Sequence, residues 1–203
     1  PKLCPVTLEL GGKNPNIIMS DADLDIAIPG VIDGMRYTRQ GQACTAGSRV
    51  YIQEKIYEKV LGGVVDKLKN LKMGNALDEN SDIGAIISKE QLDRTLHYMN
   101  IAKENSSTKV LHGGNQKKEG DYKDGFFYEP TLLSGVPVES PVCQEEIFGP
   151  VACAIPFKSF DEVLKSANNT PFGLSAVLWT QNLSRALQFV EEIEAGFVQV
   201  NQC

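Results

Sequence analysis

Beyond Phe126 the chain alternates extended and helical patterns with a regularity that a layered α/β architecture accommodates. The strand patterns lie at 127–133, 152–157, 174–179 and 197–201, and the helical patterns lie at 160–168 and 183–195. The final helix is expected to be capped near Asn182 and to stop at Gly196, because apolar residues recur at helical spacing between them. Strands joined through helices pair in parallel within one sheet. The sequence therefore predicts an α/β domain with a largely parallel sheet flanked by helices.

The first half of the chain continues the same alternation. The expected helices span residues 24–38, 54–71 and 89–103, and the expected strands span residues 49–53 and 109–111. Pro29 is expected to kink the first helix, because proline has no N–H to donate. A polar segment follows the last of these strands and predicts a surface loop at 113–124.

Composition excludes several classes of function. The formal net charge is −6 and no basic cluster extends beyond Lys117–Lys118, so no nucleic-acid partner is expected. No apolar run approaches the roughly 18 to 20 residues that span a bilayer, so no membrane partner is expected. Five irregularly spaced cysteines disfavour a disulfide framework and fit a reducing compartment, the cytosol or an organelle matrix.

Cys44 is the first candidate for chemistry. It lies in a segment of small residues, 41–47, where a substrate could approach the sulfur closely. Its own N–H could donate to the oxyanion that forms when a thiol attacks a carbonyl, and a helix starting just after it would favour the thiolate. The alternative is a buried structural cysteine, because free cysteine is among the most buried residue types.

Glu9 lies 35 positions before Cys44 and two positions before the Gly11–Gly12 turn, where a strand is expected to end. A carboxylate beside an acylated thiol can activate water for hydrolysis, so the two residues together predict covalent catalysis. The alternative for Glu9 is a solvated or turn-capping acid. Lys13, just past the glycines, is expected to be a surface charge.

Glu145 and Glu146 form a third candidate, because an aromatic residue and a Gly-Pro turn follow them. A carboxylate can accept hydrogen bonds from both hydroxyls of a ribose, whereas the alternative is a solvated face. The chain contains no G-x-G-x-x-G, Walker A or G-x-S-x-G motif. With only His97 and His112, and no Cys-x-x-Cys motif, no metal site is expected.

Three motifs, in this order, resemble the NAD(P)-dependent aldehyde dehydrogenase superfamily. They are Leu8-Glu9-Leu10-Gly11-Gly12-Lys13, Gly41-Gln42-Ala43-Cys44-Thr45-Ala46-Gly47-Ser48-Arg49 and Glu145-Glu146-Ile147-Phe148-Gly149-Pro150-Val151. The similarity extends to Asn169-Thr170-Pro171-Phe172-Gly173-Leu174-Ser175 and to the closing segment 196–201, and so covers nearly the whole chain.

The resemblance implies a role for each matching residue. Cys44 would attack an aldehyde to give a thiohemiacetal, which becomes a thioester after hydride transfer, and Glu9 would activate the water that hydrolyses the thioester. Glu146 would hold the nicotinamide ribose, Phe148 would lie near the nicotinamide, and Leu10 would contact the cofactor through its backbone. Asn201, which ends a strand, is expected near the substrate pocket with no chemical role.

The resemblance also implies a three-layer catalytic domain at 13–203, preceded by the end of a coenzyme-binding domain at 1–12. The chain would be a piece of a longer protein, without the pyrophosphate turn, the oxyanion asparagine and the C-terminal tail of the family. The implied cofactor is NAD or NADP, with NAD favoured. The implied partners are a small aldehyde and further copies of the chain in a homodimer or homotetramer.

Two other functions remain open from the sequence. One is a non-catalytic fragment or structural protein of the same fold, because the cofactor-binding half is missing from the sequence. The other is a thiol hydrolase or acyltransferase that needs no nicotinamide, since Cys44 alone would suffice for ester cleavage.

Overall fold

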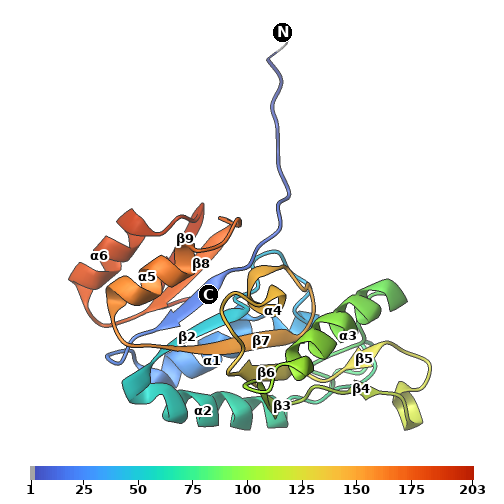
Figure 1. Ribbon diagram of the computed structural model, residues 1–203. Helices are drawn as coiled ribbons and strands as arrows, with labels where there is room; N and C mark the ends of the chain where they lie inside the picture. The colour runs from blue at the N-terminus through green and yellow to red at the C-terminus, as the bar shows by residue number, and fades with distance from the viewer. Residues whose placement is uncertain (1–2) are drawn as a thin grey trace.

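A computed structural model describes residues 3–203. The protein has three layers, in which a seven-stranded sheet lies between two layers of helices (Figure 1). The strand order is β3-β6-β7-β2-β1-β8-β9. All neighbouring strands pair in parallel except β3, which runs antiparallel to β6. The prediction of an α/β fold with a largely parallel, helix-flanked sheet is therefore confirmed.

The elements have the following bounds. The strands of the main sheet are β1 (Pro15–Ile18), β2 (Arg49–Gln53), β3 (Lys109–His112), β6 (Thr131–Ser134), β7 (Val151–Phe157), β8 (Ser175–Trp179) and β9 (Phe197–Val200). A separate two-stranded ladder joins β4 (Gln116–Lys117) and β5 (Phe127–Tyr128). The α-helices are α1 (Leu24–Gly34), α2 (Tyr57–Asn70), α3 (Lys89–Glu104), α4 (Pro141–Gln144), α5 (Phe160–Asn168) and α6 (Leu183–Glu192). Short 3-10 helices are η1 (Tyr37–Arg39), η2 (Glu54–Ile56) and η3 (Gly120–Tyr122).

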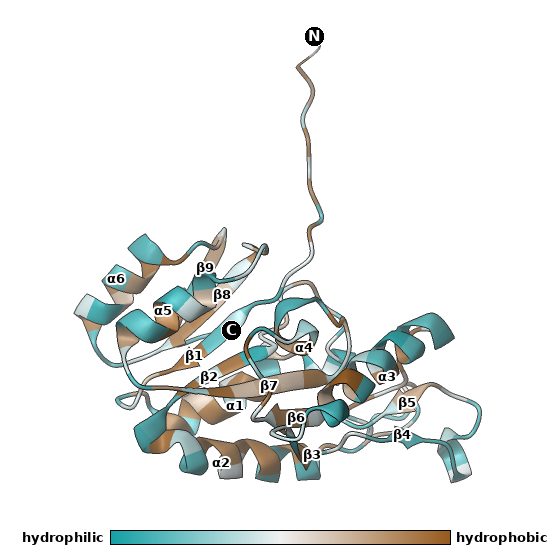
Figure 2. Cartoon of the chain, in the orientation of Figure 1, coloured by the Kyte–Doolittle hydropathy of each residue, from teal (hydrophilic) through white to brown (hydrophobic). Residues whose placement is uncertain are grey.

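The sheet separates two hydrophobic cores, because successive strand residues point to opposite faces. Ile18 packs on the face covered by α1 and α2, whereas Ile17 packs on the face covered by α3 to α6. Figure 2 shows hydrophobic colours on β7 and α1, while α3 is largely hydrophilic on the side seen in this view. Both faces of the central strands are therefore buried, as expected for a parallel sheet between helices.

Side-chain caps explain where four helices begin. Asp23, Ser88, Ser159 and Asn182 each accept a hydrogen bond from a backbone N–H in the first turn of the helix that follows. Such caps satisfy donors that have no partner inside the helix. The expected cap at Asn182 is confirmed, although the helix ends at Glu192 rather than continuing to Gly196.

Three local expectations were wrong. The strand expected at 127–133 is two strands, β5 and β6, which belong to different sheets. The first helix ends at Gly34 rather than near residue 38, because Arg36 adopts the left-handed conformation with a φ of 57° and the chain continues as η1. The polar segment at 113–124 is not only loop, since it contributes β4 and η3. Among residues 3–203, no helix is long and apolar enough to cross a bilayer.

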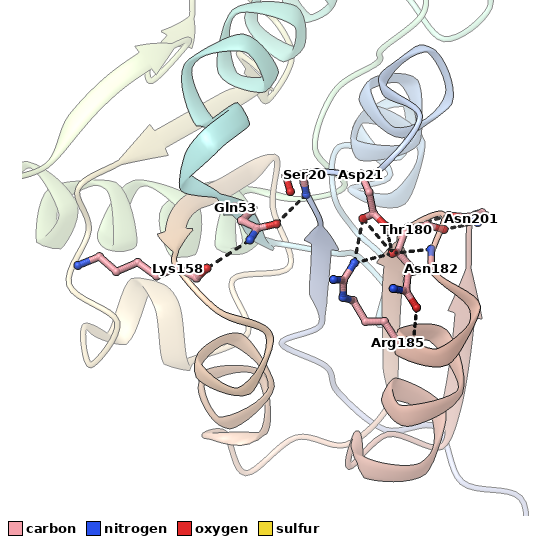
Figure 3. A network of polar contacts seen from close by, with 8 residues as sticks. All are labelled: Ser20, Asp21, Gln53, Lys158, Thr180, Asn182, Arg185 and Asn201. Carbon is pink, nitrogen blue, oxygen red and sulfur yellow. Dashed lines mark hydrogen bonds and ion pairs between the residues drawn. The ribbon is translucent and has the colours of Figure 1, made fainter.

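A polar network ties together the carboxyl ends of β1, β8 and β9 (Figure 3). The carboxylate of Asp21 accepts hydrogen bonds from the Thr180 hydroxyl and from Arg185 Nη1, each at 3.0 Å. The Asn201 side chain closes the network by bonding both the N–H and the C=O of Thr180. Asn201 therefore lies at the carboxyl edge of the sheet, and the expectation that it lies near the substrate pocket stays a prediction.

Candidate active site

Three chain segments meet at the amino edge of the sheet, just before β1, β2 and β7. A Cβ added to Gly12 would lie 2.2 Å from the backbone oxygen of Cys44, so these two backbones are in direct contact. A Cβ added to Gly41, whose φ is +63°, would lie 2.3 Å from the backbone oxygen of Gly149. Both glycines permit an approach that no other residue allows. The fold thus brings the Cys44 segment against the other two motifs of the sequence.

Cys44 lies in a turn and is partly exposed. The turn is closed by a hydrogen bond from Ala46 N–H to the Ala43 oxygen at 3.1 Å, after which the chain extends into β2. No helix begins just after Cys44, because the residues after the turn extend into a sheet strand, so a helix N-terminus does not favour the thiolate here. The description of a buried structural cysteine fits Cys143 and Cys153 instead.

Glu146 and Phe148 lie beside this turn. Gly12 N–H donates to Glu146 Oε1 at 2.9 Å, and Gly11 lies so close that an added Cβ would be 2.8 Å from Glu146 Oε2. Phe148 adopts a left-handed φ of 58° and exposes 36% of its surface. A carboxylate and an aromatic ring are therefore available within one turn of the chain, close to Cys44.

Two polar side chains of α3 hold the Glu146–Phe148 backbone. Gln91 Nε2 donates to the backbone oxygens of Ile147 and Phe148 at 2.9 and 2.8 Å. Arg94 donates to the backbone oxygens of Ile147 and Glu146. No motif in the sequence singles out either residue, and the only signal for them is that they lie three positions apart on one helix face.

Lys13 and Arg49 are buried beneath the three segments, so the expectation that Lys13 is a surface charge is wrong. Burial lowers the pKa of Lys13, which is 1% exposed. Arg49 donates to the Lys13 oxygen at 2.8 Å and to two oxygens in the last turn of α5, Ser166 O at 3.2 Å and Ala167 O at 2.8 Å. The carboxyl end of a helix favours a cation, which explains how Arg49 is held without a carboxylate.

Glu9 and Leu10 lie on the exposed segment 3–10, which leaves the layered body in Figure 1. No strand ends at Glu9, contrary to expectation, because no strand of residues 3–203 lies beside this segment to pair with it. The structure does not bring Glu9 or Leu10 into contact with Cys44, and their roles stay predictions.

Space at the meeting point is small. A cavity of about 10 Å³ lies beside the Cys44 turn, lined by residues that include Gly12, Ala43, Glu146 and Phe148. This is room for about one water molecule. A larger hollow of about 870 Å³ lies between the loops at 72–81 and 120–124 and shares no lining residue with the cavity. The space beside the Cys44 turn is therefore water-sized, and the large hollow lies elsewhere on the described part of the chain.

The chain and its fold are similar to those of several known proteins. Alpha-ketoglutaric semialdehyde dehydrogenase from Bacillus subtilis strain 168 is 42% identical over 194 residues, which cover 96% of this chain and 39% of that protein. Betaine aldehyde dehydrogenase from Staphylococcus aureus, solved in complex with NAD+, superposes with a TM-score of 0.92 at 34% identity over 96% of this chain and 38% of that one. Aldehyde dehydrogenase from Bacillus cereus, also an NAD+ complex, gives 0.91 at 41% identity, with shares of 98% and 39%.

The chain thus spans about two fifths of the length of these relatives. The sequence pattern of the aldehyde dehydrogenase family matches all of it, residues 1–203. Together with the shared fold and the converging motifs, this match shows that the chain belongs to the aldehyde dehydrogenase family.

Proposed function

We propose that this chain is the catalytic part of an enzyme that oxidises an aldehyde to a carboxylic acid with NAD or NADP. The observation that carries the proposal is the contact of a partly exposed cysteine, Cys44, with the segments that hold Gly12 and Glu146. The names of the relatives and the NAD+ in two solved structures support the reaction class and the cofactor. Residues 1–12 would be the last residues of the coenzyme-binding domain, and residues 13–203 would form the catalytic domain.

Cys44 is the nucleophile in this proposal. Attack of its sulfur on the aldehyde carbon gives a thiohemiacetal, and the carbonyl oxygen becomes an oxyanion. Among residues 3–203, nothing accepts a hydrogen bond from the backbone N–H of Cys44, so this donor is available to that oxygen. Oxidation of the thiohemiacetal then leaves a thioester on Cys44.

Glu146 and Phe148 suit a nicotinamide nucleotide. Glu146 uses Oε1 to accept from Gly12, while Oε2 has no donor among the described residues and can accept from a ribose hydroxyl. Phe148 presents a partly exposed ring beside that carboxylate. When bound, the nicotinamide supplies the hydride acceptor for the oxidation.

Glu9 is the proposed base for thioester hydrolysis. It lies three residues before Gly12, so its Cα is within about 11 Å of a glycine that touches the Cys44 backbone. Rotation of the intervening Gly11 backbone can bring the carboxylate to the thioester. The homodimeric or homotetrameric state of the whole protein and its compartment stay predictions.

The test uses the full-length enzyme. Cys44→Ala should abolish NADH formation from an aldehyde, while Cys4→Ala, which changes another free and exposed thiol, should not. Glu9→Gln should preserve a first burst of NADH and slow the steady state that follows, because acyl-enzyme accumulates. Unchanged turnover in Cys44→Ala would overturn the proposal.

A binding measurement on residues 1–203 alone decides a related point. Tight, stoichiometric NAD binding to this segment would contradict the hypothesis of a non-catalytic fragment. Ester hydrolysis by the full-length protein without any aldehyde oxidation would favour the thiol hydrolase instead.

A further inference from the structure

We infer that Asn14 is a positioning residue that orients the Cys44 turn for attack on a carbonyl carbon. This inference rests on the proposed function and adds a residue that the three sequence motifs did not single out for chemistry. Asn14 lies between the Gly11–Gly12 turn and β1, and only 3% of it is exposed.

The Asn14 side chain bonds the turn twice. Its Nδ2 donates to the backbone oxygen of Cys44 at 2.8 Å and to that of Ala46 at 3.0 Å. Its Oδ1 accepts from the backbone N–H of Ser175, at the start of β8, at 3.0 Å. Both amide protons and the amide oxygen are thus used, and the nucleophile's turn is tied to two central strands of the sheet.

These bonds set the direction of the neighbouring peptide group. In a trans peptide the C=O and the following N–H point to opposite sides, so a Cys44 oxygen directed at Asn14 directs the Thr45 N–H away from it. Neither the Cys44 nor the Thr45 N–H has an acceptor among residues 3–203. Contact with Gly12 limits movement of the Cys44 oxygen from the other side. The turn is therefore held with backbone donors free for an incoming oxygen.

Asn16 provides a matched control. It is equally buried, lies two residues further on, in β1, and accepts from Trp179 Nε1 at 2.7 Å through its own Oδ1. Its side chain makes no hydrogen bond to the Cys44 turn. In both positions Asp keeps the oxygen that accepts and removes the two amide donors.

The experiment compares two reactions of Cys44 in the full-length protein. Acylation by p-nitrophenyl acetate passes through an oxyanion, whereas alkylation by iodoacetamide does not. Asn14→Asp should slow acylation by up to about 100-fold, because outright loss of an oxyanion donor costs at least that much and this variant only misaligns the backbone donors. It should change alkylation far less. Asn16→Asp should leave both rates close to wild type. Mass spectrometry of the Cys44 peptide separates this thiol from the other cysteines of the protein, four of which lie in residues 1–203.

Three results would overturn the inference: unchanged acylation in Asn14→Asp, an equal loss of acylation and alkylation, or an equal loss of acylation in Asn16→Asp. If Asn14→Asp does not fold, as judged by its melting curve, Asn14→Ser serves in its place with the same expected split between the two reactions. Failure of the proposed function looks different, because the wild-type protein would then form no NADH from an aldehyde, whatever the effect of Asn14→Asp on the two rates.

Discussion

Gly12 offers a direct test of the packing at the Cys44 turn. In Gly12→Ala the new methyl group would lie 2.2 Å from the Cys44 oxygen and within 2.8 Å of both polar atoms of the Asn14 amide. The nearest atom belongs to the backbone and has no rotamer to change. Restoring an ordinary contact requires a displacement of about 1 Å, which is enough to break the bonds between Asn14 and the turn.

The expected loss follows from these contacts. Two hydrogen bonds contribute about 1 kcal/mol each, and overpacking of a close contact costs about 1 to 3 kcal/mol. Alanine also has fewer conformations than glycine in the unfolded chain, which offsets about 0.5 kcal/mol of this destabilisation. Gly12→Ala should therefore lower the free energy of unfolding by about 2.5 to 4.5 kcal/mol.

Urea unfolding followed by the fluorescence of Trp179, the single tryptophan, measures this loss. Gly62→Ala is the control, because Gly62 lies in α2 with nothing within 4 Å of an added Cβ. That substitution should raise the free energy of unfolding by about 0.5 to 1 kcal/mol. A loss below about 1 kcal/mol in Gly12→Ala would refute the reasoning, because it would be little more than the roughly 0.5 kcal/mol by which ordinary surface substitutions change stability.

Three further outcomes follow. Lys13→Met should raise the free energy of unfolding by about 1 kcal/mol or more, because methionine removes a buried charge. Burial lowers the pKa of Lys13 in the folded state below its value of 10.5 in the unfolded chain, so the stabilisation measured by urea titration should be larger at pH 6 than at pH 9. Arg49→Met should lower the free energy of unfolding by about 3 to 5 kcal/mol in the same urea titration, because the backbone oxygens at the end of α5 lose their hydrogen-bond donor. Gln91→Leu should weaken NAD binding to the full-length protein, measured by calorimetry, with little change in the alkylation rate of Cys44, because Gln91 holds the Phe148 backbone and not the cysteine turn.

The sequence predicted those parts of the fold whose signals are local. The helix at 160–168 and the strand at 49–53 have the expected bounds, because each has regular periodicity and the helix has a Ser159 cap. The predicted end of the first helix was wrong, because Arg36 adopts a left-handed conformation and no glycine marks this position in the sequence. Nothing in a two-residue strand such as β4 produces a periodic pattern.

The candidate site, like the fold, could be predicted from the sequence only where the signals are local. Its three motifs were visible because glycines mark tight turns, and the structure shows why Gly12 and Gly41 are needed there. The burial of Lys13 and the bonds of Gln91 were not visible, because they depend on segments far apart in the sequence. The relation of Glu9 to Cys44 remains a prediction, since Glu9 lies on an exposed segment that the sheet does not hold.

The place of β1 in the sheet has a consequence for how the chain acquires its structure. β1 is first in sequence, but it lies between β2 and β8, and its Asn16 pairs with Val177. Contacts of such sequence separation slow folding, because a long loop must close before they form. During synthesis β1 would leave the ribosome long before β8, so the backbone N–H and C=O groups on the edge of β1 that pairs with β8 would have no partner strand. Until residues 175–179 arrive, that edge is a site where chaperones or other nascent chains can bind.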